Sequence, residues 1–185
     1  MAKENKINDR ILAVESDIDL GEISVRHGIH SFKYGTSEFL TDIFDIIQPD
    51  GSDTFYDLGS GYGIVLFYGA ENYPGAQFKG IEIVNERYDM SVALLKENGL
   101  QNVELINKDM FDYDFTDGTI FYIYNPLFKD IYPKLIARLK EISLKHPITI
   151  IAESRCTVFD ETEWLEKFDE VFVDLVRRIH FYRSK

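Results

Sequence analysis

Asp57-Leu58-Gly59-Ser60-Gly61-Tyr62-Gly63 decides the fold, because this stretch joins a strand pattern to a helix pattern. Residues 54–58 favour a strand, and residues 64–73 are typical of a helix that Pro74-Gly75 ends. Glycines at such a junction let the backbone turn tightly and bring its N–H groups against a ligand. We therefore expect the glycine turn to form a wall of a ligand site at the carboxyl end of the first strand.

Strand and helix patterns alternate along the rest of the chain. Further strands are predicted at 77–83, 103–107, 119–124 and 148–152, and further helices at 36–48, 85–98 and 129–144. Short connections between them favour right-handed crossovers and an α/β fold, with a doubly wound, mostly parallel sheet and helices on both faces. The segments 170–175 and 179–183 predict a closing antiparallel pair, which completes seven strands.

Composition narrows the class of protein. The 20 basic and 32 acidic residues give a formal net charge of −12, which repels naked nucleic acid and anionic membranes and suits a small molecule or a basic protein segment. The single cysteine, Cys156, excludes an intramolecular disulfide. No apolar run is long enough to span a bilayer, and the first residues lack the core of a signal peptide. We therefore expect a cytoplasmic protein, of open oligomeric state.

Two acidic residues stand at the ends of the second and third predicted strands. Glu82, in the segment GIEI at 80–83, can accept both hydroxyl hydrogen bonds of an adenosine ribose. Asp109, in NKDMF at 107–111, can accept a hydrogen bond from an adenine amino group, although it could equally be an ordinary helix cap. NAD would also satisfy Glu82, but Ile64 stands where a dinucleotide fingerprint has its third glycine.

The fourth predicted strand ends in YIYNPLF at 122–128, on the lip that faces the ligand crevice in such sheets. The side-chain carbonyl of Asn125 can orient a substrate amine, and Tyr124 and Phe128 can stack on a flat group or surround a cation. Asn125-Pro126 also suits a cap that opens the helix at 129–144. The two interpretations are compatible, and both stay open.

The four ordered motifs DLGSGYG, GIE, KDMF and YNPLF resemble those of the class I, seven-strand, Rossmann-like methyltransferases that use S-adenosylmethionine. The resemblance runs from Tyr34 to the C-terminus and implies S-adenosylhomocysteine as a product. By this resemblance the cofactor-binding residues are Tyr34, Thr36, Asp57, Gly59, Ser60, Gly61, Gly63, Glu82, Asp109, Met110 and Asn125. Of these, Tyr34 and Thr36 lie in YGTS, which looks like the cofactor-closing loop of seven-strand protein lysine methyltransferases of the histone-modifying kind.

The resemblance implies two parts, an N-terminal arm or lid at 1–35 and an S-adenosylmethionine-binding methyltransferase domain at 36–185. The arm contains 22–26, whose alternation predicts a short strand or β-ribbon, and two histidines, His27 and His30, which lack further ligands for a zinc site and are expected on the surface. No metal is expected. Because the arm is the least generic part, we expect it to help choose the substrate, so that deleting 1–30 spares cofactor affinity.

The function that the resemblance implies is methyl transfer to an unidentified nucleophile, with a protein side-chain amine or a small-molecule amine as the expected class. The expected catalytic residues are Asn125, Tyr124 and Phe128. NPLF is similar to the Asn-Pro-Pro-aromatic motif of enzymes that methylate planar amino groups but departs from it at Leu127, which weakens the case for such a substrate. The alternatives are an NAD-dependent oxidoreductase and a catalytically degenerate methyltransferase fold that serves as a binding module.

Overall fold

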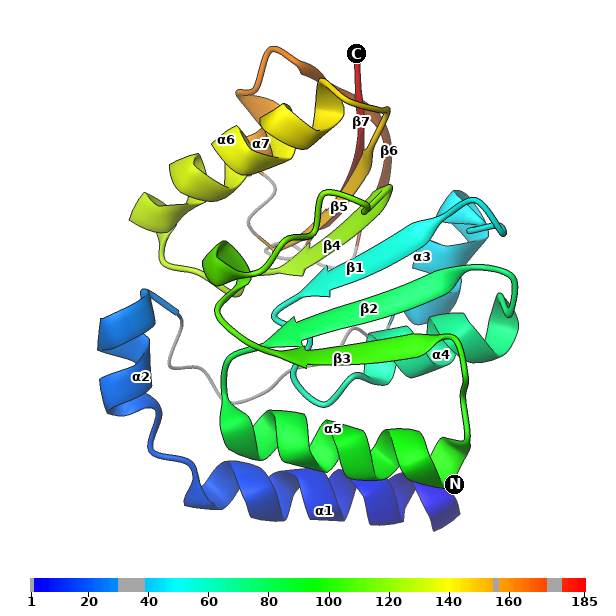
Figure 1. The fold of residues 1–185 in the computed structure, drawn as a ribbon, viewed down its shortest axis with the longest axis vertical. Coiled ribbons are helices and arrows are strands. Elements are labelled where there is room, and N and C mark those ends of the chain that lie inside the picture. The colour runs from blue at the N-terminus through cyan, green and yellow to red at the C-terminus, as the bar shows by residue number, and fades with distance from the viewer. Residues whose placement is uncertain (1, 30–38, 155–156, 173–177) are drawn as a thin grey trace.

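The computed structural model describes residues 2–29, 39–154, 157–172 and 178–185. Its strands form one seven-stranded sheet in the order β3-β2-β1-β4-β5-β7-β6 (Figure 1). The strands are β1 (Thr54–Leu58), β2 (Gln77–Glu82), β3 (Val103–Asn107), β4 (Ile120–Tyr124), β5 (Thr149–Glu153), β6 (Leu165–Phe172) and β7 (Arg178–Ser184). The helices are α1 (Ala2–Asp17), α2 (Leu20–His27), α3 (Leu40–Ile47), α4 (Ile64–Asn72), α5 (Asn85–Asn98), α6 (Tyr132–Ser143) and α7 (Thr157–Asp160), with short 3-10 turns η1 (Met110–Asp112) and η2 (Lys129–Ile131).

The sheet has the predicted topology. Strands β1 to β5 pair in parallel, and β7 runs antiparallel to both β5 and β6. The order of the strands reverses at β1, which pairs with β2 on one side and β4 on the other. A crevice forms beyond the carboxyl ends of the strands at such a switch point. The prediction of a doubly wound, mostly parallel sheet with an antiparallel C-terminal pair is confirmed, although β6 begins at Leu165 and not at residue 170.

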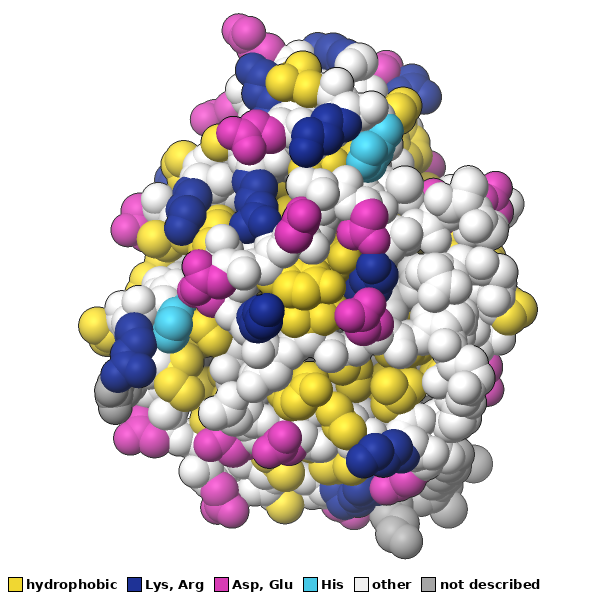
Figure 2. Space-filling view, in the orientation of Figure 1, with side chains coloured by type: hydrophobic (Ala, Val, Ile, Leu, Met, Phe, Trp, Pro, Cys, Tyr) yellow, Lys and Arg dark blue, Asp and Glu magenta, His cyan; other side chains and the backbone are white. Residues whose placement is uncertain are grey.

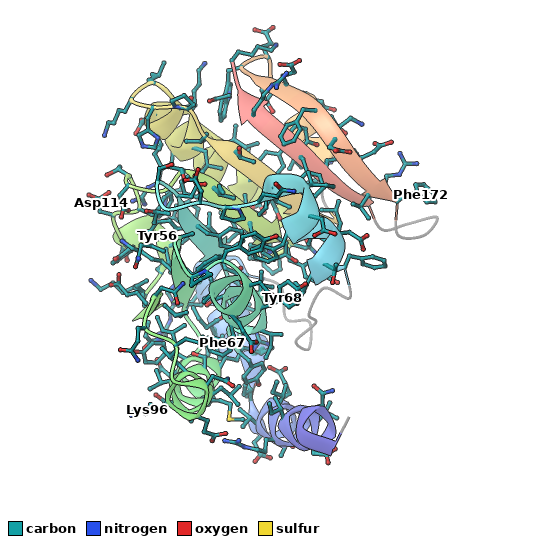
Figure 3. All side chains as sticks on the ribbon, turned by 90° about the vertical axis from the view of Figure 1, so that its right-hand side faces the viewer. Tyr56, Phe67, Tyr68, Lys96, Asp114 and Phe172 are labelled. Carbon is teal, nitrogen blue, oxygen red and sulfur yellow. The ribbon has the colours of Figure 1, made fainter. Side chains whose placement is uncertain are left out.

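Alternating side chains of the strands form two apolar layers, one on each face of the sheet. One layer contains Tyr56 and the α6 residue Leu139, and the other contains Phe55 and the α4 residue Phe67. Tyr56 and Phe67, labelled in Figure 3, therefore belong to opposite layers. Because the core is full on both faces, the carboxyl edge of the sheet is the place where polar side chains can gather.

The N-terminal helix α1 packs on α5 and extends the helical layer on that side, as both Figure 1 and Figure 3 show. Figure 1 shows α2 beside the carboxyl ends of the parallel strands. An isolated antiparallel bridge between Ile29 and Leu127 and a 2.6 Å hydrogen bond from the Phe128 N–H to the Gly28 carbonyl fasten the chain there. The N-terminal residues are thus tied to the rest of the fold at two separate places.

Residues 22–26, predicted as a short strand or β-ribbon, lie within α2, and that prediction is wrong. The side chain of Asp19 caps the helix by accepting a backbone hydrogen bond from its first turn, and Gly28 ends it with φ of 63°. Helical spacing buries Ser24 and leaves Val25 82% exposed, which inverts the alternation that a strand would need. Caps at both ends therefore outweigh the alternating pattern.

Asn125-Pro126 does not open the helix predicted at 129–144, so the capping interpretation is wrong. Asn125 has φ of 47°, and Leu127 bridges to Ile29 before the helical region begins. That region is divided into η2 and α6, and Pro133 stands in the first turn of α6. The left-handed conformation of Asn125 and the bridge together turn the chain away from a helix.

No helix in the described ranges is both long and apolar enough to cross a membrane. The first residues of the helix predicted at 36–48 lie outside the described residues, as do His30 and Cys156.

Candidate functional site

A cavity of about 300 Å³ opens at the carboxyl ends of the central strands. Of the residues predicted to form the site, those that line this cavity are Asp57, Gly59, Ser60, Gly61, Glu82, Asp109, Met110, Tyr124 and Asn125. The volume lies at the lower end of the range found for small-molecule sites. Figure 2 shows acidic and basic side chains interspersed over the face drawn in Figure 1, without one continuous patch of either sign.

The glycine turn approaches both neighbouring motifs closely. Gly59 has φ of 97°, and a Cβ on it would lie 2.8 Å from Cβ of Pro126, so only glycine lets the NPLF segment pack against the turn. The N–H groups of Gly59 and Ser60 donate to the carbonyl of Ile81 over 2.9 Å and 3.0 Å. Gly63, also in the left-handed region at φ of 77°, precedes α4 and does not line the cavity.

Glu82 is held at the end of β2 by backbone donors. Its carboxylate accepts hydrogen bonds from the N–H of Gly61 over 2.7 Å and of Val84 over 2.8 Å, one on each oxygen. Each oxygen keeps a further lone pair, so the carboxylate can still accept two hydroxyls. Burial raises the pKa of Glu82, while the charge of Arg87 and the backbone donors oppose that rise.

Asp109 caps η1, as one of the two interpretations of its position predicted, and it also contacts His27. One carboxylate oxygen accepts the N–H of Phe111 over 2.9 Å and so caps η1. The other lies 3.0 Å from Nδ1 of His27. Met110, which follows it, is buried and presents apolar surface to the same cavity. A polar edge beside an apolar face is what an adenine ring needs.

Buried carboxylates gather at this edge from three strands. Burial, with the neighbouring charges of Glu82 and Glu153, raises the pKa of Asp57 well above its usual range. Glu153, at the end of β5, accepts the hydroxyl hydrogen of Tyr122 over 2.6 Å, and Tyr122 lines the cavity. The electrostatic character of the site therefore favours a ligand that carries positive charge.

The predicted catalytic residues are divided by the structure. Tyr124 and Asn125 line the cavity, whereas Phe128 does not and instead donates its backbone N–H to Gly28. Tyr34 and Thr36, predicted to close over the cofactor, lie outside the described residues.

Several cavity-lining residues were not predicted from the sequence. They are His27, Ile29, Val65, Ile81, Ile83, Arg87, Lys108, Tyr122, Pro126 and Leu127. His27 was expected on the surface, but its side chain is 28% exposed and paired with Asp109, 82 residues away. A local pattern carries no signal for such a contact. The sequence did contain a signal for Arg87. This residue lies in the first turn of α5, the helix that follows Glu82, so its positive charge falls near that carboxylate.

The chain matches a known family over its central part. The sequence model of the family described as "Histone methylation protein DOT1" matches residues 29–133. A protein-lysine N-methyltransferase of Saccharolobus islandicus (strain REY15A) is 25% identical over 101 residues, which are 53% of this chain and 63% of that protein. The chain thus covers less than two thirds of this relative's length.

Solved structures share the fold at low sequence identity. An RNA methyltransferase from Salinibacter ruber, in complex with S-adenosyl-L-homocysteine, is 23% identical with a TM-score of 0.60, covering 82% of this chain and 92% of that one. A precorrin-6y C5,15-methyltransferase from Geobacter metallireducens GS-15 is 13% identical with a TM-score of 0.59, covering 87% and 94%. The Rossmann-like methyltransferase fold predicted from the four motifs is confirmed. Since the names of these two proteins point to different substrates, the fold does not select one.

Proposed function

This chain belongs to the family of the histone methylation protein DOT1, and from that premise we propose that it transfers the methyl group of S-adenosylmethionine to a lysine side chain of a protein. The observation that carries the proposal is that one cavity is lined by two kinds of residue. Glu82 and Asp109 suit the adenosine part of the cofactor, and Tyr124 and Asn125 suit a methyl acceptor. The matched Saccharolobus protein is named a protein-lysine methyltransferase, and a net charge of −12 suits a basic segment.

The residues of the cavity suit this cofactor in three respects. Glu82 keeps one lone pair on each oxygen for the two ribose hydroxyls, and Asp109 beside Met110 suits the adenine. Asp57 lines the same cavity, where its carboxyl oxygens can accept hydrogen bonds from the ammonium group at the methionine end. When bound, S-adenosylmethionine supplies an electrophilic methyl group on a positively charged sulfur.

The acceptor side has to present a neutral amine in a fixed direction. An amine that loses its proton has one lone pair, and the side-chain oxygen of Asn125 accepts one of its hydrogens so that this lone pair points into the cavity. Tyr124 lines the same side and helps to exclude water. Removal of the amine from water favours its neutral form. Tyr124 and Asn125 can therefore present a neutral amine without a dedicated base.

The proposal is tested first by binding and then by transfer. Calorimetric titration should give micromolar binding of S-adenosylhomocysteine to the wild type and a loss of about a hundredfold in Glu82→Gln, which leaves the buried donors with a weaker acceptor. Glu104→Gln, on the exposed side of β3, is the matched control and should bind normally. Binding of NADH alone would instead support an oxidoreductase.

Transfer is then followed with a radiolabelled methyl donor. We expect label in basic proteins, recovered as methyl-lysine after acid hydrolysis. Label that appears only in small molecules would replace the protein by a small amine as the acceptor. Cofactor binding without transfer to either class would support a degenerate binding module.

A further inference from the structure

A buried carboxylate of the N-terminal helix reaches the wall of the cavity. Glu15, in α1, is only 7% exposed, and its Oε1 accepts hydrogen bonds from the Tyr62 hydroxyl over 2.8 Å and from Nε of Arg87 over 2.7 Å. Nη2 of Arg87 donates to the other oxygen over 3.2 Å. Tyr62 belongs to the glycine turn, and Arg87 lines the cavity. One side chain of α1 is therefore bonded to two parts of the site.

Arg87 connects this contact to Glu82. The guanidinium is nine-tenths buried and opposes the rise in the pKa of Glu82 that burial causes. Asp57 lies close enough to Glu82 for their charges to repel. Arg87 and Glu82 line the same cavity, so the guanidinium offers a compensating charge to the carboxylate, and the bonds to Glu15 fix where that cation stands.

We propose that α1 is a working part of the cofactor site, because Glu15 holds Arg87 in place in the cavity that it lines together with Glu82, the acceptor for the ribose of the cofactor. Glu15 and Arg87 are positioning residues, since they act through Glu82. The proposal rests on the proposed function, which makes Glu82 the ribose acceptor. It replaces the expectation that the arm serves the substrate alone and that deletion of residues 1–30 spares cofactor affinity.

A second ion pair between α1 and α5, the helix that carries Arg87, offers a matched control. Arg10 of α1 donates to both carboxylate oxygens of Glu97 in α5, over 2.9 Å and 3.0 Å, and this pair is exposed. Glu97→Gln breaks this α1–α5 ion pair without touching the cavity, whereas Glu15→Gln breaks the buried one. We expect the dissociation constant of S-adenosylhomocysteine to rise about tenfold or more in Glu15→Gln and to stay within about twofold in Glu97→Gln.

A double variant separates positioning from simple support of the fold. Glu15→Gln with Arg87→Met removes both partners of the buried ion pair, so part of the thermal stability that Glu15→Gln loses should return, because the guanidinium is no longer buried without Glu15. Cofactor affinity should stay low, because Glu82 has lost its cation. Recovery of affinity together with stability would overturn the proposal.

A cofactor analogue without the ribose hydroxyls supplies a second test, which a purely structural role of Glu15 would not pass. With an S-adenosylhomocysteine analogue that lacks the 2′ and 3′ hydroxyls, the wild type and Glu15→Gln should bind alike, since the interaction in question is gone. Equal weakening for both ligands would overturn the proposal. If the wild type binds no S-adenosylhomocysteine at all, the proposed function itself fails. If Glu82→Gln loses binding while Glu15→Gln keeps it, only the role of α1 fails.

Discussion

Nδ1 of His27 lies 3.0 Å from Oδ2 of Asp109, so a residue of α2 contacts the carboxylate proposed to bind adenine. The contact is partly buried, and both residues line the cavity. The helix that carries His27 is fastened by the bridge between Ile29 and Leu127, which lies on the acceptor side. The segment at 27–29 therefore joins the two ends of the cavity.

Replacing His27 should weaken cofactor binding. In His27→Ala, Oδ2 of Asp109 loses its partner while Oδ1 keeps the N–H of Phe111, so the carboxylate is held less firmly and we expect the dissociation constant of S-adenosylhomocysteine to rise about three- to tenfold. His146→Ala is the control, because His146 contacts the backbone carbonyls of Thr116 and Pro147 and does not line the cavity. Calorimetric titration of both variants makes the comparison, and equal affinities would contradict the role assigned to His27.

Gly59→Ala should damage the site through the backbone. Its φ of 97° and a Cβ only 2.8 Å from Pro126 combine conformational strain with a steric clash. We expect a loss of about 2–4 kcal/mol in the free energy of unfolding, together with loss of cofactor binding. Gly99→Ala is matched, because Gly99 also has positive φ, at 66°, but a Cβ there would meet nothing within 4 Å. It should cost about 1 kcal/mol and spare binding. Urea denaturation measures the free energy of unfolding of both variants.

Asp57→Asn should stabilise the protein while it removes function. Burial, with the charges of Glu82 and Glu153, raises the pKa of Asp57 in the folded state, so folded protein binds a proton that unfolded protein has released. The contribution of Asp57 to stability therefore increases as pH falls between its raised folded pKa and about 4. At neutral pH the asparagine variant avoids the free-energy cost of burying the Asp57 carboxyl group and should be more stable than the wild type.

Thermal denaturation across this pH range checks the sign of that effect. The gain of Asp57→Asn over the wild type should shrink toward the acid end, where Asp57 is itself neutral. S-adenosylhomocysteine, which carries an ammonium group, should bind the variant weakly. A variant less stable than the wild type at neutral pH would show that the Asp57 charge is compensated.

Local sequence predicted the central strands and the glycine turn, because strand alternation and the backbone freedom of glycine act within a few residues. It failed at Asn125-Pro126, where a bridge to Ile29 outweighs a good capping pattern. It also missed Glu15 and Arg87, whose bond joins positions 72 residues apart. A buried glutamate in a mostly polar helix has no local mark, since only the tertiary fold decides which acidic side chain is covered.

The role of Asn125 can be separated from the backbone that carries it. Asn125 has φ of 47°, a conformation that asparagine and glycine accept more easily than alanine. Asn125→Gly therefore removes the side chain without adding strain, whereas Asn125→Ala adds about 1 kcal/mol of strain as well. If the side-chain oxygen orients the acceptor amine, kcat should fall about 10- to 100-fold in both variants. The dissociation constant of S-adenosylhomocysteine should change by less than about threefold in the glycine variant, because Glu82 and Asp109 are untouched. If Asn125→Gly keeps wild-type kcat while Asn125→Ala loses it, the backbone conformation is what the site needs and the side chain plays no part in orienting the amine.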